Sequence, residues 1–394
     1  MVSVRKIDLL HLRVPLKTRV KHASHDRTES DNLAVRVTLD DGTEGHGEGV
    51  PRPYVTGETV ETTFETLSAL DCPGRLGRIT SFEALIGRLE TLELAETASD
   101  PRGMAGNAAR CALELAILDA YGRLFRRPVS DAIRIAGTPD VRLSERPTRV
   151  RYSGAITAAT GARERASAWK LWLYGFAHVK LKVGVDGQDD VSRMYSLRKI
   201  LGNRVDLRID ANEAWKACEV VERVRPLLPF RPSVLEQPLK HDEVDELAEI
   251  RPRIGVPVML DESLCGYPDA VRSIERRTAD MFNVRLSKCG GIIPALRIIG
   301  LARRSGVGVQ LGCHPGETAL LSSAGRHFAS TVRGLRYIEG SYDNHILSEN
   351  LTGEDFTFGY GGWAPAMQGA GLGVKLDRGA LDRMTVTRKE IRYD

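Results

Sequence analysis

The sequence predicts an α/β protein in which a small α+β module precedes a closed barrel of parallel strands. Three observations support this fold class. The length of 394 residues and the ordinary globular composition suit two domains, or one barrel with an added module. Near residue 150 the pattern changes, and short apolar strands begin to alternate with helical stretches. Eight such strands follow, and eight parallel βα units favour closure into a barrel.

The N-terminal module is predicted to span residues 1–130. Alternating apolar and polar residues predict three strands, of which the last two are joined by a tight turn at Asp41-Gly42: Ser3–Val14, Leu33–Leu39 and Glu44–Glu48. Two segments without periodicity are predicted loops, a mobile one at Lys17–Asp31 and a second at Gly49–Thr59. Apolar residues at helical spacing predict a helix over Ala108–Leu124.

The barrel is predicted from eight short apolar runs with helical stretches between them. Active sites of such barrels lie at the C-terminal ends of the strands, so the residues that end each strand are the informative ones. The predicted strands are Val150–Ile156, His178–Val183, Val205–Ile209, Ser233–Leu235, Val256–Leu260, Met281–Leu286, Val307–Gly312 and Leu335–Ile338.

The composition argues against several classes of partner. The net charge of +4 comes from 56 basic and 52 acidic residues that form no long runs, so nucleic-acid binding is not predicted. No stretch approaches the roughly 20 apolar residues of a membrane span, and the first residues alternate like a strand rather than a signal peptide. Six scattered cysteines without a C-x-x-C pair favour a reduced, cytoplasmic protein.

Three acidic residues follow successive barrel strands. Asp210, Glu236 and Asp261 are separated by 26 and 25 residues, about one βα unit each, so we expect them to meet at one rim. Three carboxylates gathered without compensation would repel one another strongly. A purely oxygen ligand set favours a hard divalent ion, Mg²⁺ first and Mn²⁺ second. The alternative is that each acid only caps the helix that follows it.

Two lysines share one face of the second barrel strand. In the segment FAHVKLKVGVDG, Lys180 and Lys182 are two residues apart and therefore point the same way. Lysines can protect a sheet edge, but a closed barrel has no edge to protect. Beside a metal that binds a substrate carboxylate, a lysine can instead remove the α-proton and leave an enediolate. Burial, the metal and the charge of Lys180 would all lower the pKa of Lys182 toward a usable range.

Together these motifs resemble the enolase superfamily, in its muconate lactonizing enzyme-like subgroup, over nearly the whole chain. They are the K-x-K pair of Lys180 and Lys182, then DAN at Asp210, EQP at Glu236, DES at Asp261 and the later SKCGG. The resemblance implies a modified TIM barrel, (β/α)7β, at residues 131–370. An N-terminal α+β capping domain at 1–130 would precede it, and a C-terminal segment, 371–394, would return to that domain.

The resemblance also implies roles for individual residues. Asp210, Glu236 and Asp261 would hold Mg²⁺, Lys182 would be the acid or base on one face of the substrate, and Lys180 would assist it. The loops Lys17–Asp31 and Gly49–Thr59 would close over the substrate. Family habit favours a homo-oligomer acting on a small-molecule carboxylate.

The sequence departs from the family pattern at the sixth and seventh strands. The subgroup normally has a second lysine on the opposite face, but that position is Arg285 here, with Lys288 three residues later. Arginine stays protonated and is a poor base, although it can hold an anion. His314 ends the seventh strand, as in the mandelate racemase-like subgroup, but Arg285 replaces its aspartate partner. His314 is therefore either a catalytic residue or a loop residue before Pro315-Gly316.

Five further residues are candidates for the site. Asn212 and Glu262 are predicted to hold the metal ligands in place without binding the metal themselves. Glu339 and Asp343, after the eighth strand, are predicted to bind a substrate ammonium or hydroxyl group, or only to cap structure. Tyr54, in the second predicted loop, is a candidate substrate contact.

The leading hypothesis is a Mg²⁺-dependent enzyme that abstracts the proton α to a carboxylate on one face, as a cycloisomerase or a syn-dehydratase-like lyase. The alternative is a racemase or epimerase of amino-acid derivatives or dipeptides, with Lys182 and either Lys288 or His314 as the two bases. A third hypothesis, a non-catalytic metal-binding barrel, predicts lost ligands or lysines. None is missing from the set of Lys182, Asp210, Glu236 and Asp261.

Overall fold

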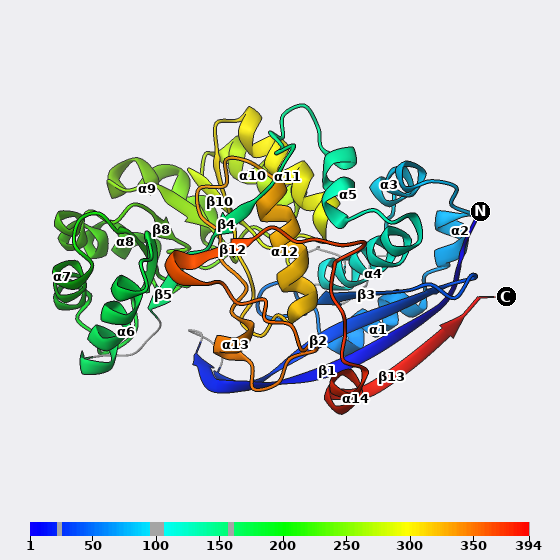
Figure 1. The fold of residues 1–394 in the computed structure, drawn as a ribbon. Helices are drawn as coiled ribbons and strands as arrows, with labels where there is room; N and C mark the ends of the chain where they lie inside the picture. The colour runs from blue at the N-terminus through cyan, green and yellow to red at the C-terminus, as the bar shows by residue number, and fades with distance from the viewer. Residues whose placement is uncertain (22–25, 95–105, 157–160, 394) are drawn as a thin grey trace.

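The fold is known from a computed structural model that describes residues 1–21, 26–94, 106–156 and 161–393. Figure 1 shows an antiparallel sheet with its helices beside a curled parallel sheet, and the two termini lie at the same end of the first sheet. None of the helices in the described ranges combines the length and apolar character that a membrane crossing needs.

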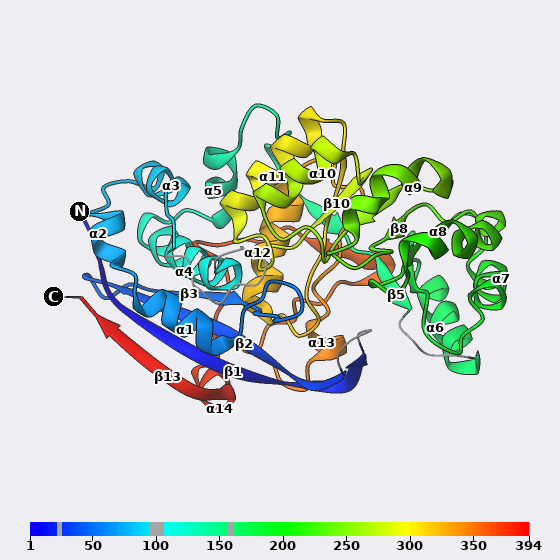
Figure 2. The ribbon, with the colours of Figure 1, turned by 180° about the vertical axis from the view of Figure 1, so that it is seen from behind.

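The N-terminal part is built on a four-stranded antiparallel sheet. Its order is β13-β1-β2-β3, so the last strand of the chain lies beside the first. Figure 2 shows the helices of this part against the sheet. The strands are β1 (Val4–Lys21), β2 (Asp26–Leu39), β3 (Glu44–Gly49) and β13 (Thr385–Arg392), and the helices are α1 (Val60–Ser68), α2 (Cys72–Leu76), α3 (Phe82–Glu90) and α4 (Asn107–Phe125).

The prediction of a mobile loop over Lys17–Asp31 is wrong for its described part. β1 continues to Lys21 and β2 begins at Asp26, with Val20 paired to Arg27 and Lys21 to Asp26. Polar residues form these strand ends because the backbone pairing, not an apolar periodicity, holds them. Residues 22–25 lie outside the described residues. The second predicted loop is confirmed, since no helix or strand forms between the end of β3 and α1.

Glycines let β3 lie directly against the predicted helix, which forms as α4. A Cβ atom placed on Gly47 would lie 2.1 Å from the carbonyl oxygen of Ala112. Gly45 and Gly49 are equally close to the backbone of α4, at Ala120 and Ala108. Glycine at every second strand position therefore faces alanine at every fourth helix position, which matches the two periods of strand and helix.

The barrel sheet has seven parallel strands in the order β11-β10-β9-β8-β7-β6-β5. Short strands suffice because both faces are covered, and nearly all of their residues are buried. A separate antiparallel pair joins β4 (Arg149–Arg151) to β12 (Trp363–Pro365). The barrel strands are β5 (Gly154–Ile156), β6 (His178–Lys182), β7 (Asp206–Asp210), β8 (Leu235–Glu236), β9 (Val258–Leu260), β10 (Met281–Val284) and β11 (Gly308–Leu311).

Two of the predicted barrel strands differ from expectation. The predicted first strand is divided into β4 and β5. The predicted eighth strand forms no ladder, but Ile338 makes an isolated parallel bridge to Leu311, and its carbonyl oxygen accepts a hydrogen bond of 2.8 Å from Ser153 N. Residues 336–339 thus hydrogen-bond along β11, and Ile338 joins this segment to Ser153 beside β5, so the predicted barrel closes through the segment.

Helices surround the barrel sheet, as Figure 1 shows. They are α5 (Val129–Ala136), α6 (Gly161–Leu173), α7 (Asp190–Leu201), α8 (Ala217–Val224), α9 (Leu247–Ile254), α10 (Tyr267–Arg276), α11 (Ile292–Arg304) and α12 (Ala319–Thr331). Two further helices, α13 (Asp343–Ile346) and α14 (Arg378–Met384), contact β1 of the antiparallel sheet. Domain bounds at residues 130 and 370 stay predictions.

Buried acids of the N-terminal part cap two barrel helices. Glu48 on β3 accepts hydrogen bonds from the backbone N–H groups of Thr318 and Leu321, at the start of α12. Glu114 on α4 does the same for Ile292 and Ile293 at the start of α11, at 2.5 and 3.1 Å. Carboxylates satisfy the free N–H groups and the positive end of a helix, so these contacts fix the N-terminal part over the barrel.

Candidate active site

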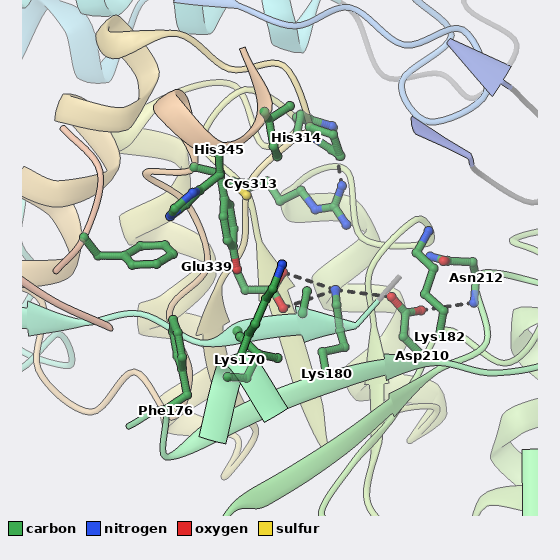
Figure 3. Close-up of a pocket in the computed structure, with 18 of the residues that line it drawn as sticks. Lys170, Phe176, Lys180, Lys182, Asp210, Asn212, Cys313, His314, Glu339 and His345 are labelled. Atoms are coloured by element: carbon green, nitrogen blue, oxygen red, sulfur yellow. Dashed lines mark hydrogen bonds and ion pairs between the residues drawn. The ribbon is translucent and has the colours of Figure 1, made fainter. Parts of the chain in front are cut away.

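A cavity of about 770 Å³ opens at the C-terminal ends of the barrel strands. Its size is typical of sites for small molecules. Figure 3 shows side chains from several strands converging on it, with Lys180 near its centre. The N-terminal part contributes Arg27, Tyr54 and Val55 to its wall, so the cavity lies between the two parts of the chain.

Lys180 lies among three carboxylates at the charged end of this cavity. Its Nζ lies 3.2 Å from Asp210 Oδ2, 3.4 Å from Glu236 Oε2 and 3.2 Å from both oxygens of Glu339. Burial alone would lower the pKa of Lys180, but the surrounding carboxylates outweigh it and raise that pKa. Lys180 is therefore held as a cation.

Lys182 lies two residues further along β6 and lines the same cavity. Burial lowers its pKa below the ordinary lysine value; Asp210 opposes this shift and the charge of Lys180 adds to it. Of the two lysines on this strand, Lys180 thus holds its proton more strongly and Lys182 less strongly than an ordinary lysine. This suits Lys182 for proton transfer and Lys180 for holding charge.

Two of the predicted metal ligands lie side by side. Asp210 and Glu236 are directly paired in the register of β7 and β8, and both are fully buried. Glu236 Oε1 accepts a hydrogen bond of 2.8 Å from Asn283 Nδ2, whereas Glu236 Oε2 accepts none from the part of the chain that the structure describes. Burial raises the pKa of Glu236 to about 7, and the neighbouring Lys180 opposes this.

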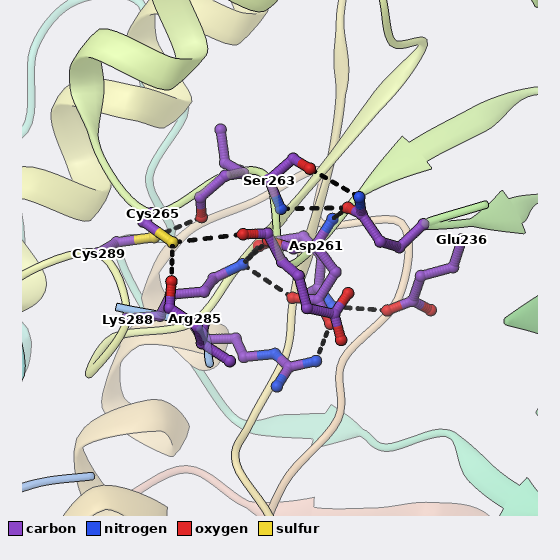
Figure 4. A network of polar contacts seen from close by, with 12 residues as sticks. Glu236, Asp261, Ser263, Cys265, Arg285, Lys288 and Cys289 are labelled. Carbon is purple, nitrogen blue, oxygen red and sulfur yellow. Dashed lines mark hydrogen bonds and ion pairs between the residues drawn. The ribbon is translucent and has the colours of Figure 1, made fainter. Parts of the chain in front are cut away.

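Asp261, the third predicted ligand, is engaged by two cations (Figure 4). Its Oδ2 contacts Arg285 Nη2, and its Oδ1 lies 2.8 Å from Lys288 Nζ. Lys288 also donates to the carbonyl oxygens of Asp261 and Asn283, at 2.5 and 2.9 Å. An ammonium group has three donors, so these contacts use all of them. Lys288 is fully buried and does not line the cavity, and burial lowers its pKa to about 8.

The donor chemistry of this site fits a hard divalent ion. Asp210 and Glu236 end β7 and β8, Asp261 directly follows β9, and all three are buried. One oxygen of Glu236 has no hydrogen-bond partner among the described residues. Within the described ranges, however, no three Asp, Glu, His or Cys side chains are gathered as a metal-binding group. Lys180, Arg285 and Lys288 neutralise the acids instead. The three ligands therefore stay a prediction.

Arg285 and His314 meet across the upper wall of the cavity. Arg285 Nη1 lies 3.5 Å from His314 Nδ1, and both residues line the cavity. Burial, together with the charge of Arg285, lowers the pKa of His314 well below its usual range, so the ring is neutral. An arginine can only donate, so Nδ1 accepts and the proton lies on Nε2. This Nε2 is buried and has no hydrogen-bond partner within the described ranges.

The structure separates the remaining predicted residues into two groups. Tyr54, Asn212, Glu262 and Glu339 line the cavity, and Asn212 Nδ2 donates to Glu262 Oε1 at 3.3 Å. Asp343 does not line it. Its Oδ2 accepts a hydrogen bond of 2.7 Å from Ser322 Oγ, inside the protein.

Several cavity residues were missed by sequence reasoning. Lys170 on α6, Arg27 near the start of β2, and the aromatic residues Phe176, Tyr342, His345 and Phe358 all line the cavity. One signal was available, because Phe176 has the same strand parity as Lys180 and Lys182. The others come from helix ends, irregular segments and, for Arg27, the polar start of β2, where no apolar periodicity indicates which way a side chain points.

Comparison with known proteins places this geometry in a family. Residues 162–380 match the family model described as enolase C-terminal domain-like. The chain belongs to this family. It is 27% identical over 399 residues to N-succinyl-L-Arg/Lys racemase of Bacillus cereus, a match that covers 99% of this chain and 100% of the relative. It is also 27% identical over 396 residues to muconate cycloisomerase 1 of Rhodococcus opacus, covering 98% and 99% of the two chains.

Solved structures of similar proteins have the same overall fold as this chain. The crystal structure of the Bacillus cereus racemase has a TM-score of 0.83 at 25% identity, and the match covers 99% of this chain and 100% of that chain. A dipeptide epimerase from Cytophaga hutchinsonii, complexed with Mg and D-Ala-L-Val, has a TM-score of 0.81 at 25% identity, with the same coverage. The predicted fold class is confirmed, and the chain is an enolase-superfamily enzyme.

Proposed function

We propose that the chain is a Mg²⁺-dependent isomerase or lyase that removes the proton α to a carboxylate from one face, with Lys182 as the base. The product would form by cycloisomerisation or by syn-elimination. The observation that carries this proposal is that none of the three residues predicted to act opposite Lys182 is placed to act as a base. Lys288 is buried beneath Asp261, Arg285 is a permanent cation, and His314 presents Nδ1 to Arg285.

Asp210, Glu236 and Asp261 are the residues that would hold Mg²⁺, or Mn²⁺ in its place. A bound divalent ion would stabilise the negative charge that develops on the substrate carboxylate. For Asp261 to serve as a ligand, it would have to share its oxygens with Arg285 and Lys288. A carboxylate has about four lone-pair sites, so this sharing is chemically allowed.

The protein's own residues would do the remaining work. Lys182 Nζ would accept the α-proton, and for syn-elimination it would return a proton to the leaving group on the same face. Arg285 and the Nε2–H group of His314 would donate hydrogen bonds to the developing anion. Lys180 would keep the charge of Asp210, Glu236 and Glu339 balanced beside the base.

Proton exchange in D₂O tests the proposal. A library of acid sugars, N-acyl amino acids, dipeptides and muconate-like acids is incubated with the enzyme and Mg²⁺, and deuterium at the α-carbon is followed by NMR. We expect wash-in with retained configuration, or conversion to a cyclised or dehydrated product. Lys182→Met should abolish it, whereas Lys170→Met, a cavity lysine on another element, should keep it. Exchange with loss of configuration would exclude the one-face version.

A racemase or epimerase is the second candidate, because relatives such as the Bacillus cereus racemase carry that activity. On this chain it would need His314 to act as the second base through the other ring tautomer. His314→Asn separates the candidates. It should remove racemisation if His314 is a base, and leave one-face exchange measurable if His314 only donates a hydrogen bond.

We also propose that the enzyme works in the cytoplasm as a homo-oligomer on a small-molecule carboxylate. The exposed surface of α6 supports association, because Trp169 and Trp172 are 48% and 47% exposed there. Light scattering coupled to size-exclusion chromatography gives the mass in solution, and a purely monomeric species would contradict this proposal.

A further inference from the structure

We propose that the cavity has a second compartment, an aromatic chamber that takes an aryl or bulky apolar group of the substrate. The aromatic chamber is defined by Ala155, Leu171, Phe176, Tyr342, His345 and Phe358. This inference rests on the proposed function, which puts the reacting carboxylate at the charged end with Lys182. It adds the chemical class of the group at the other end of the substrate.

The cavity residues separate in space largely by their chemistry, although the charged Lys170 lies on the aromatic side of Lys180. Figure 3 shows Lys182, Asp210 and Asn212 on one side of Lys180, and Phe176 and His345 on the other. Lys180 and Glu339 stand between the two sides and are joined by an ion pair. A substrate that places its α-carbon at Lys182 and passes this pair would therefore enter apolar surroundings.

Phe358 organises the chamber wall. Its ring centroid lies 5.5 Å from that of Phe176 and 5.3 Å from that of Tyr342, both at nearly perpendicular interplanar angles. The ring of His345 is 5.4 Å away. These are the distances and the edge-to-face geometry that aromatic pairs favour, so a further ring could join the cluster.

Neither polar ring of the chamber, Tyr342 or His345, presents a charge to a bound group. Tyr342 donates its hydroxyl proton to the carbonyl oxygen of Ser153, at 2.6 Å, so the chamber receives its ring rather than a polar group. Burial lowers the pKa of His345, which leaves its imidazole neutral at physiological pH. Phe176 and Phe358 are 6% and 5% exposed and are thus held in place before any ligand binds.

The volume of the cavity supports a long ligand. About 770 Å³ is far more than a compact carboxylate needs at Lys182, and it lies in the upper range for sites that hold drug-sized molecules. Exposed Leu173 and Tyr174 continue the apolar lining toward the surface, so the chamber is reachable from solvent. An acyl chain that ends in a phenyl ring is a suitable occupant.

Isothermal titration calorimetry with two matched ligands tests the chamber without turnover. N-acetyl-L-alanine and N-(3-phenylpropanoyl)-L-alanine share the α-carbon and carboxylate and differ only in the distal group. With Mg²⁺ present, we expect the phenyl ligand to bind wild type roughly tenfold to a hundredfold more tightly, as burial of one aromatic side group implies.

A variant that fills the chamber and a matched control show whether the preference for the phenyl ligand comes from the aromatic chamber. Ala155 is exposed and lines the chamber, so Ala155→Trp should fill it and remove the preference while N-acetyl-L-alanine binds unchanged. Ala166→Trp, on the exposed face of α6 and away from the cavity, should keep the preference. Phe358→Leu should reduce it partly.

The outcomes distinguish the two proposals. Equal affinity of both ligands, binding of neither, or a preference that Ala155→Trp leaves intact overturns the aromatic chamber, whatever the exchange experiment shows. A chamber-dependent preference without α-proton exchange in any library member supports the chamber and overturns the proposed function.

Discussion

Arg285 Nη1 lies 3.5 Å from His314 Nδ1, while Nη2 of the same guanidinium contacts Asp261. One arginine therefore connects a predicted metal ligand to the one histidine predicted to act in catalysis. The pattern of the muconate lactonizing enzyme-like subgroup has a lysine in this place, and a lysine can take up a proton where an arginine cannot. The proposal of one-face chemistry therefore depends on Arg285.

Arg285→Lys should therefore create activity on the second face. Burial and the neighbouring cation Lys288 would both lower the pKa of a lysine in this place toward a usable range, while Asp261 would oppose them. We expect racemisation of a substrate that wild type exchanges with retention, measured by chiral chromatography after incubation in D₂O.

Arg285→Met is the control for Arg285→Lys, because it removes the charge without supplying a base. We expect it to lower kcat by roughly a hundredfold, the usual cost of one lost anion-stabilising donor, with no racemisation. If Arg285→Met racemises the substrate as well as Arg285→Lys does, another residue is the second base.

Metal binding should raise the melting temperature of the protein. If Asp210, Glu236 and Asp261 hold Mg²⁺, millimolar Mg²⁺ should raise the melting temperature of protein freed of metal with EDTA, because a ligand that binds only the native state stabilises it. Glu236→Gln should remove most of this rise, and Glu222→Gln, on the exposed face of α8, should keep it. An unchanged response in Glu236→Gln would exclude Glu236 as a ligand.

The rim of the barrel could be predicted because the strand period and the βα spacing are strong signals. Spacings of 26 and 25 residues suggested that Asp210, Glu236 and Asp261 share one rim, and the register of β7 and β8 does pair Asp210 with Glu236. Lys180 and Lys182 point as the alternation of a strand requires. Such regularities survive folding because neighbouring parallel strands end together.

What the sequence could not predict depends on contacts between distant segments. Lys17–Asp31 looked like a loop because its strand character comes from pairing between β1 and β2, not from apolar alternation. Lys288 looked available until the fold placed it beneath Asp261. The aromatic chamber combines Phe176, before β6, with Phe358, from an irregular segment almost 200 residues later, and no local pattern links them.

Gly47→Ala should destabilise the protein by about 3 kcal/mol or more, the upper range for overpacking a core. The added methyl group would lie 2.1 Å from Ala112 O and 2.4 Å from Ala116 N, and these backbone atoms of α4 have no room to move. Urea denaturation measures the change. Gly87→Ala is the matched control, because a Cβ there meets no atom of the described residues within 4 Å and alanine favours its helix. Equal stability of the two variants would contradict the close approach of β3 and α4.

Asp343→Asn should flatten the dependence of stability on pH. Burial raises the pKa of Asp343 from 3.8 to about 6, with the hydrogen bond from Ser322 opposing it. The neutral form is thus favoured in the folded state, so this group's contribution to stability is fully present below pH 3.8. It is lost as the pH rises through about 6.

Wild type should therefore lose about 2 kcal/mol more of its free energy of unfolding than Asp343→Asn between pH 4 and pH 8, at about 1.4 kcal/mol per pKa unit, because part of the contribution is already lost at pH 4. Chemical denaturation across this range gives the difference directly. Because the amide oxygen can still accept from Ser322 Oγ and the side chain is off the cavity, KM should stay unchanged. A raised KM with unaltered stability would instead return Asp343 to the substrate-binding role that its position after the eighth strand suggested.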